Sequence, residues 1–285
     1  MFDIKDILEP ETLEKALELL AQNAELKIIA GGTDVLIKLH HRRIKEVELL
    51  SLRKIKGLDK ISMLEDGSIE IGAMASFAQI FRDSIVEKHI KVLAEGAVSM
   101  GGPQVRNMAT IGGNVCNGAV SADSAPSLFC LNAKVRLKNK YGERIIPIQD
   151  FYKGPGKVDI KSDEILISLI IEKESYENTI GHYIKFSNRK AMDIAMVSVC
   201  VVSSIENGKF NDLRIALGVA APTPIRCSEA ENYAKGLEIT EENIDKIAEF
   251  AVKSSKSRNS WRASKDFREH LIKELTKRGI KETIK

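Results

Sequence analysis

The sequence has few cysteines, and none is placed where a bound metal or cluster would need it. The four cysteines, Cys116, Cys130, Cys200 and Cys227, lie far apart with no C-x-x-C pair. Metal and iron–sulfur sites usually draw on such a local pair, because closing a short loop costs little entropy. We therefore expect reduced, buried thiols in a cytoplasmic protein and no bound metal.

Long apolar runs are also absent. The longest, IAMVSVCVV at residues 194–202, has about half the length that a membrane-spanning helix needs. The N-terminal MFDIKDILEPETLEKAL carries acids from its third residue and has no apolar core of signal-peptide length. These absences lead us to expect a cytoplasmic protein without membrane spans.

A strong charge of either sign is missing as well. The 43 basic and 40 acidic residues leave a net charge of +3, and they are scattered along the chain. This balance predicts neither a nucleic-acid-binding face nor a membrane-surface protein. With 44% apolar and 29% charged residues in 285, the chain has ordinary globular composition and room for one large domain or two smaller ones.

The first part of the chain predicts mixed α/β structure. EPETLEKALELLAQN is typical of a helix with Pro10 in its first turn, LKIIAGG of a buried strand, and VELLSLRKI of a second strand, in a small lobe ending near residue 55. A hairpin across Asp66-Gly67, a helical region at 77–99, a helix in PSLFCLN and strands in AKVRLKN and DEILISLIIE follow. We assign residues 1–175 to one domain, with subdomains at about 1–55 and 56–175.

A second domain is expected at residues 176–285. Strand-like runs there form a hairpin across Asn207-Gly208, and helical sequence extends from about residue 227 to the end. Trp261 and Phe267, near the last helix, are compatible with a partner-docking face or with packing of that helix on its own domain.

Two double-glycine loops are the main candidate site. There is no G-x-G-x-x-G after the first strand and no G-x-x-x-x-G-K-[ST], so neither a Rossmann fingerprint nor a P-loop is supported. Instead, the loops at residues 30–34 (AGGTD) and 109–114 (ATIGGN) each combine paired glycines with a threonine. Glycine N–H groups can approach an anion closely, so two such loops could hold adjacent phosphates, or each could simply be a turn.

The polar residues near these loops have two possible roles. A carboxylate at Asp34 would repel a phosphate, so we expect its side chain to cap the following helix. Asp123 could start a helix before Pro126 or accept hydroxyls of a sugar-like or ribityl chain. Asn114 and Asn117 could bond either the backbone or a ligand.

Several segments together resemble one protein family. IIAGGTDVLIKLHH, GGPQVRNMATIGGNVCNGAVSADSAP, GPGKV, AMDIA, LGVAAPTPIRC and SWRASKDFREHLIKEL are similar to the FAD-binding subunit of the molybdenum-containing hydroxylases, most of all the bacterial xanthine dehydrogenases. The resemblance spans nearly the whole chain. It implies an α+β fold of the vanillyl-alcohol-oxidase type: two α/β subdomains grip FAD, followed by a domain with a three-stranded antiparallel sheet and helices.

The resemblance also implies which residues contact FAD. The two glycine loops become the pyrophosphate cradle, Asn117 and Asp123 match the ribityl and phosphate region, and Leu166 and Lys185 match the edge of the isoalloxazine ring. Ile194 matches the residue that faces the ring, although on its own it would be taken for a core residue in a strand. The implied FAD-binding residues are Ile28, Ala30, Gly31, Gly32, Thr33, Asp34, Val35, Thr110, Gly112, Gly113, Asn114, Asn117, Asp123, Leu166 and Lys185.

By the same resemblance, the chain carries electrons rather than performing acid–base catalysis. A large subunit with the molybdenum cofactor and a small subunit with two [2Fe–2S] clusters would be its partners, and NAD⁺ the acceptor. The first loop has no histidine, and His40 and His41 come several residues later, so FAD should be bound non-covalently. The alternatives are an FAD subunit of a nicotinate, carbon monoxide or other heterocycle dehydrogenase, and a non-catalytic adaptor with a degenerate nucleotide site.

Overall fold

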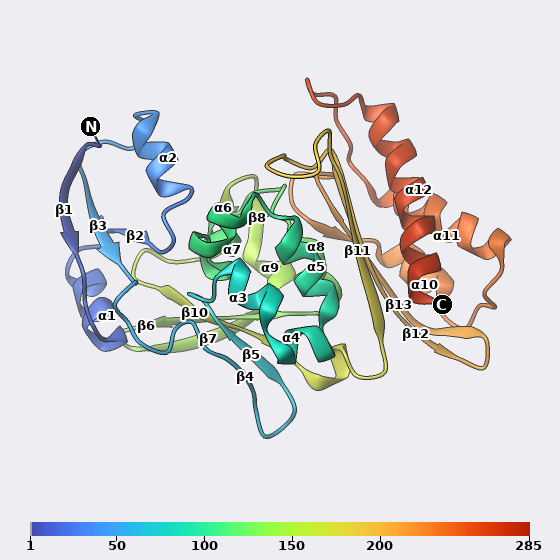
Figure 1. Cartoon of the computed structure of the whole chain (residues 1–285), viewed down its shortest axis with the longest axis horizontal. Helices are drawn as coiled ribbons and strands as arrows, with labels where there is room; N and C mark the ends of the chain where they lie inside the picture. Colours follow the sequence, from blue (N-terminus) through green and yellow to red (C-terminus); the bar gives the residue numbers. More distant parts are fainter. Residues whose placement is uncertain (1) are drawn as a thin grey trace.

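Three main sheets follow one another along the chain and across the molecule (Figure 1). The computed structural model describes residues 2–285. A three-stranded sheet lies at the blue, N-terminal side, a five-stranded sheet in the middle, and a four-stranded sheet beside the red C-terminal helices. A two-stranded ribbon of β8 (Tyr152–Gly154) and β9 (Lys157–Val158) completes the strands.

The first sheet is parallel, with the order β1-β3-β2. Its strands are β1 (Ile4–Leu8), β2 (Lys27–Ile29) and β3 (Val47–Ser51), with helices α1 (Leu13–Gln22) and α2 (Val35–His40). Helix α1 begins after the cap Thr12, so the prediction that Pro10 lies in its first turn is wrong. The predicted burial of β2 is also wrong: as an edge strand, it leaves Lys27 exposed. Strand β1 has mostly exposed side chains and therefore gives no apolar pattern to predict it from.

The middle sheet is antiparallel throughout, in the order β4-β5-β10-β6-β7. The predicted hairpin across Asp66-Gly67 is confirmed, with Gly67 at φ +82°. The strands are β4 (Ile61–Met63), β5 (Ile69–Gly72), β6 (Lys134–Asn139), β7 (Gly142–Pro147) and β10 (Ile165–Ile171). The helices are α3 (Phe77–Arg82), α4 (Ser84–His89), α5 (Lys91–Ser99), α6 (Pro103–Met108), α7 (Ile111–Asn117), α8 (Ala125–Cys130) and α9 (Ile148–Phe151), and the short 3₁₀ turn η1 is Lys173–Ser175.

The third sheet contains the predicted Asn207-Gly208 hairpin, and both turn residues have positive φ, 51° and 74°. Its order is β11-β12-β13-β14, all antiparallel. Three strands were expected, β11 (Ile180–Phe186), β12 (Val197–Glu206) and β13 (Lys209–Gly218); the two-residue β14 (Ile225–Arg226) adds a fourth at the edge. Helices α10 (Ser228–Ala234), α11 (Glu241–Ser254) and α12 (Lys265–Thr283) follow.

Helices cover both faces of the third sheet. Helices α10 and α12 pack on one face, with α11 against both of them, whereas α5 and α8 of the middle unit contact the other face (Figure 1). Helix α12 thus packs on its own domain, as one of the two alternatives expected. Trp261 lies just before it and is 82% exposed, while Phe267 contacts Phe186 edge-on. Within residues 2–285, no helix combines the length and apolar character needed to cross a bilayer.

The junction of α5 with β11 should make stability depend on pH near neutrality. His182 Nδ1 lies 3.2 Å from Glu95 Oε2, and this hydrogen bond raises the pKa of His182. Because the pKa of His182 is higher in the folded than in the unfolded chain, its bond to Glu95 stabilises the fold fully at pH values below the unfolded pKa of about 6.5. This stabilisation is lost as the pH rises through the folded pKa of His182. Urea titrations from about pH 5 to 8 should show this loss in the wild type but not in Glu95→Gln. The same change of unfolding free energy with pH in both proteins would contradict this role of the His182–Glu95 pair.

Candidate functional site

The turn after β2 depends on both of its glycines. A Cβ at Gly31 would lie 1.8 Å from the carbonyl oxygen of Met108, because this turn packs directly against the backbone at the end of α6. Gly32 has φ +76°, a conformation that side chains with a Cβ rarely adopt. The first glycine loop is therefore shaped by contact with the segment that leads into the second one.

The first loop presents a run of free backbone donors. Among the described residues, no protein acceptor receives a hydrogen bond from the N–H groups of residues 31–35, whereas the next N–H group, that of Leu36, bonds the carbonyl of Gly32 at 2.9 Å. Asp34 occupies the cap position of α2, but its side chain makes no capping bond, so the predicted capping role is wrong. Consecutive unpaired N–H groups form a concave, electropositive nest that suits an anion.

The second loop behaves differently. The N–H groups of Ile111 and Gly112 donate to the carbonyls of Ala75 (3.0 Å) and Ala73 (2.9 Å). Those of Gly113 and Asn114 bond the side chain (3.2 Å) and the carbonyl (3.0 Å) of Thr110, which caps α7. The expectation that both loops offer free N–H donors is therefore wrong for this loop. Gly112 serves close packing instead, since a Cβ there would lie 2.6 Å from that of Ala73.

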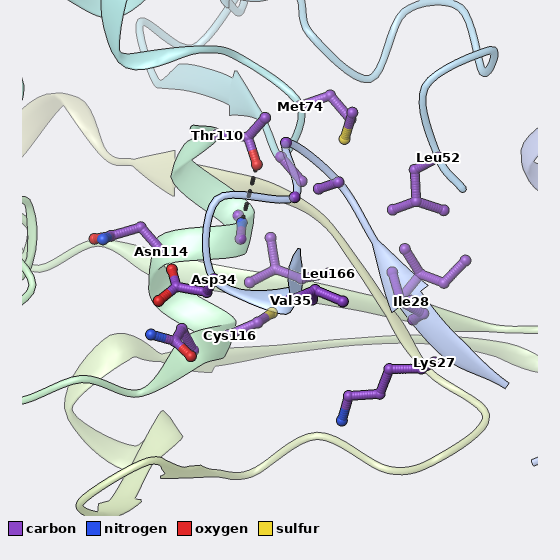
Figure 2. A pocket seen from close by; sticks show the side chains of 18 of the residues that line it. Lys27, Ile28, Asp34, Val35, Leu52, Met74, Thr110, Asn114, Cys116 and Leu166 are labelled. Atoms are coloured by element: carbon purple, nitrogen blue, oxygen red, sulfur yellow. Dashed lines mark hydrogen bonds between the residues drawn. The ribbon is translucent and has the colours of Figure 1, made fainter. Parts of the chain in front are cut away.

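Both loops line one cavity of about 640 Å³, a size within the usual range of about 300–1,000 Å³ for small-molecule and cofactor sites. Figure 2 shows apolar Ile28, Leu52 and Met74 toward one end, with Asp34 and Asn114 toward the other. Of the residues expected at the site, those that line the cavity are Ile28, Ala30, Gly31, Gly32, Thr33, Asp34, Val35, Thr110, Gly112, Gly113, Asn114, Asn117 and Leu166.

Lys38 and Cys116 also line this cavity, and the sequence reasoning missed both. Lys38 Nζ donates to Asn117 Oδ1 at 2.8 Å, which joins α2 to α7 and fixes a positive charge in the wall. It lies one helical turn after Asp34, a spacing that could have indicated it. Cys116 is only half-buried, in contrast to the expected burial, while the other three cysteines are buried. Desolvation by the surrounding protein nevertheless raises the pKa of its thiol to about 12, so the thiol stays protonated.

Asp123 and Lys185 lie together in a buried cluster outside the cavity lining. Lys185 Nζ lies 2.9 Å from Asp123 Oδ2 and 3.1 Å from the carbonyl oxygen of Ser99, and the Tyr183 hydroxyl bonds Asp123 Oδ1 at 3.1 Å. Burial raises the pKa of the Asp123 carboxyl, against the opposing effect of Lys185. Helix α8 begins later, with Ser124 in the cap position, so the alternative in which Asp123 starts that helix is wrong.

Ile194 also lies outside the cavity lining, in the loop between β11 and β12. Its side chain is 46% exposed and strand β12 begins only at Val197, so the alternative of a core strand residue is wrong.

Comparison with known proteins agrees with this architecture. Residues 2–172 match the family described as the FAD binding domain in molybdopterin dehydrogenase, and residues 182–283 match the CO dehydrogenase flavoprotein C-terminal domain. The xanthine dehydrogenase FAD-binding subunit of Escherichia coli O157:H7 is 42% identical over 284 residues, which cover 100% of this chain and 97% of that subunit. The nicotinate dehydrogenase FAD-subunit of Eubacterium barkeri is 30% identical over 84% of this chain and 82% of that subunit.

A solved structure shares the fold over nearly its whole length. The matching chain of carbon monoxide dehydrogenase from Hydrogenophaga pseudoflava superposes with a TM-score of 0.94 at 25% identity, covering 99% of this chain and 98% of that one. The chain therefore belongs to the family of FAD-binding medium subunits of molybdenum hydroxylases.

Proposed function

We propose that this chain binds FAD non-covalently and passes electrons from the [2Fe–2S] clusters of a partner subunit to NAD⁺, within a cytoplasmic xanthine- or purine-type dehydrogenase. The observation that carries the proposal is the run of free N–H groups at residues 31–35 on the wall of a cavity of about 640 Å³. Its full-length similarity to a xanthine dehydrogenase FAD-binding subunit supports the choice of substrate class.

The residues present fit a dinucleotide. The pyrophosphate of FAD needs donors and some positive charge, which the N–H groups of residues 31–35 and the Lys38 ammonium group supply. The free Nδ2 groups of Asn114 and Asn117 add neutral donors, since only their Oδ1 atoms are bonded within the described chain. When bound, FAD supplies the ability to accept single electrons and to release two as a hydride.

Non-covalent binding is supported by the position of the two nearest histidines. His40 ends α2 and His41 follows it, both are exposed, and neither lines the cavity. A covalent bond to FAD requires a nucleophilic side chain beside the ring, and the protonated thiol of Cys116 is a poor nucleophile.

We assign the hydroxylation of the substrate to a large partner subunit that carries the molybdenum cofactor. A nicotinate-type complex is the second candidate, because the Eubacterium barkeri subunit is also similar over most of its length. Assays of the assembled complex with xanthine, hypoxanthine and nicotinate, each with NAD⁺, separate the two. Turnover of nicotinate alone would reject the purine assignment, and a complex that reduces artificial dyes but not NAD⁺ would reject the acceptor.

The flavin assignment is tested on the isolated chain. Purified protein should show the visible absorption bands of a flavin, or take up one FAD on titration, and acid precipitation should release all of it. A chain that binds no FAD under any of these conditions would leave the adaptor alternative standing.

Lys38→Met is expected to weaken FAD binding about tenfold, or by about 1.4 kcal/mol, because it removes a charge-assisted hydrogen bond to phosphate. It should also reduce the salt dependence of binding. Lys45→Met is the matched control, since Lys45 is exposed and lies outside the cavity lining. Fluorescence titrations with FAD at low and high salt measure both effects, and equal affinities for the two variants would contradict the role of Lys38.

A further inference from the structure

The 187–196 loop, which joins β11 to β12, lies against the rim of the cavity. Met196 N bonds Phe186 O at 2.8 Å and closes the loop, and Met192 N bonds Gly101 O at 3.1 Å. A Cβ at Gly102 would lie 2.9 Å from the sulfur of Met192. Gly101 and Gly102 lie between Met100 and Val105, which line the cavity, so Met192 anchors the 187–196 loop next to the cavity wall.

Arg268 of α12 reaches this loop from the other side. Only 3% of the residue is exposed, and its Nη1 donates to the carbonyl oxygen of Met196 while its Nη2 donates to Ser260 Oγ at 2.8 Å. One guanidinium thereby joins the end of the 187–196 loop to the segment that precedes α12. Figure 1 shows both segments at the same end of the third sheet.

Burying the Arg268 guanidinium costs more free energy than a purely structural contact would require. Among the described residues, Arg268 has no carboxylate within salt-bridge distance, and its Nε has no partner. Burial and the like charges of Arg258 and Arg262 lower its pKa. A buried charge without a counter-ion is destabilising, and an apolar side chain of similar size would often be more stable there. Such a group is a candidate for a functional role.

We propose that Arg268 is a positioning residue that holds the 187–196 loop, and with it Ile194, over the isoalloxazine ring of bound FAD. Met196 is two residues from Ile194, so fixing its carbonyl group limits the displacement of Ile194 to the slack of about two extended residues, near 7 Å at most. A planar guanidinium suits this role because its two amino groups reach two separate acceptors at once. The inference rests on the proposed binding of FAD.

Arg268→Met in the isolated, FAD-loaded chain tests the role. The FAD dissociation constant should change by less than about threefold, since the N–H groups of residues 31–35 are distant and untouched. Collisional quenching of the flavin fluorescence by iodide should rise severalfold as Ile194 uncovers the ring, and the visible circular dichroism of the flavin should change. Arg268→Lys, which keeps one donor for Met196, should restore most of the wild-type signal.

Arg214→Met is the matched control. Arg214 is 5% exposed and likewise donates to two backbone carbonyls, those of Cys130 (2.6 Å) and Ser175 (2.8 Å). Unlike Arg268 it has a carboxylate partner, Asp212 Oδ2 at 2.8 Å from its Nε, and its strand position pairs with Val202, away from the 187–196 loop. Wild-type quenching in Arg268→Met, or equal increases in both arginine variants, would overturn the inference. If Arg268→Met does not fold, Ser260→Ala takes its place, because Ser260 accepts the second hydrogen bond of Arg268. A modest rise in iodide quenching in Ser260→Ala supports the positioning role of Arg268, and unchanged quenching overturns it. Failure of the wild type to bind FAD would instead reject the proposed function.

Discussion

Gly31→Ala is expected to weaken FAD binding severely. The new Cβ would be placed 1.8 Å from the carbonyl oxygen of Met108 and 2.7 Å from its carbon, and neither backbone atom can rotate away. The first loop must therefore move off the end of α6, which disrupts the run of free N–H groups. We expect the dissociation constant to rise at least about 100-fold, or about 2.7 kcal/mol, and the free energy of unfolding to fall by about 1–3 kcal/mol.

Gly142→Ala is the control for this substitution. A Cβ at Gly142 meets nothing within 4 Å, and its φ is not positive, so alanine fits there. Isothermal titration with FAD and urea unfolding of both variants separate loss of the site from loss of the fold. Wild-type affinity in Gly31→Ala would show that the contact between this loop and α6 does not shape the site.

Lys185→Met is expected to lower the free energy of unfolding by about 3–5 kcal/mol, because it leaves the Asp123 carboxylate buried without a counter-charge. The double variant Lys185→Met/Asp123→Asn should recover most of the loss, since it removes both charges. Urea unfolding of the two single variants, the double variant and the wild type completes a double-mutant cycle that isolates the interaction.

The loss in Lys185→Met should depend on pH with a defined sign. Burial already raises the pKa of Asp123, and the variant lacks the ammonium group that opposes this, so the folded pKa rises further. The protonated carboxyl is then favoured by the fold, and the loss shrinks as pH falls toward the unfolded value of about 3.9. The claim that Lys185 neutralises the buried Asp123 carboxylate would be contradicted by either of two results. One is a loss of unfolding free energy that does not depend on pH, and the other is a double variant as unstable as Lys185→Met.

Local signals in the sequence predicted much of the fold. The Asn207-Gly208 turn requires positive φ at both positions, and few residue pairs other than Asn-Gly accept that. The apolar positions Ala16, Leu17 and Leu20 fall on one face of α1 and are buried, as helical spacing demands. The two glycine loops were placed at one site by the same kind of local pattern together with the family resemblance.

The hydrogen bonding of the site could not be predicted, because it depends on partners distant in the chain. The N–H groups of the second loop are paired with Ala73 and Ala75, which come more than thirty residues earlier, and no pattern in TIGGN shows this. The hydrogen bond from Lys38 to Asn117, which lies 79 positions away, likewise has no signal in the local sequence. Such contacts arise from tertiary packing, which local sequence does not specify.

The central claim is that the first loop holds FAD through its backbone while the second loop does not. Amide hydrogen exchange of the isolated chain, with and without saturating FAD, tests it directly. The N–H groups of residues 31–35 should exchange rapidly in the free chain and become strongly protected by FAD, whereas those of residues 111–114 should be protected in both states. Unchanged exchange at residues 31–35 upon FAD saturation, or new protection confined to residues 111–114, would contradict the account.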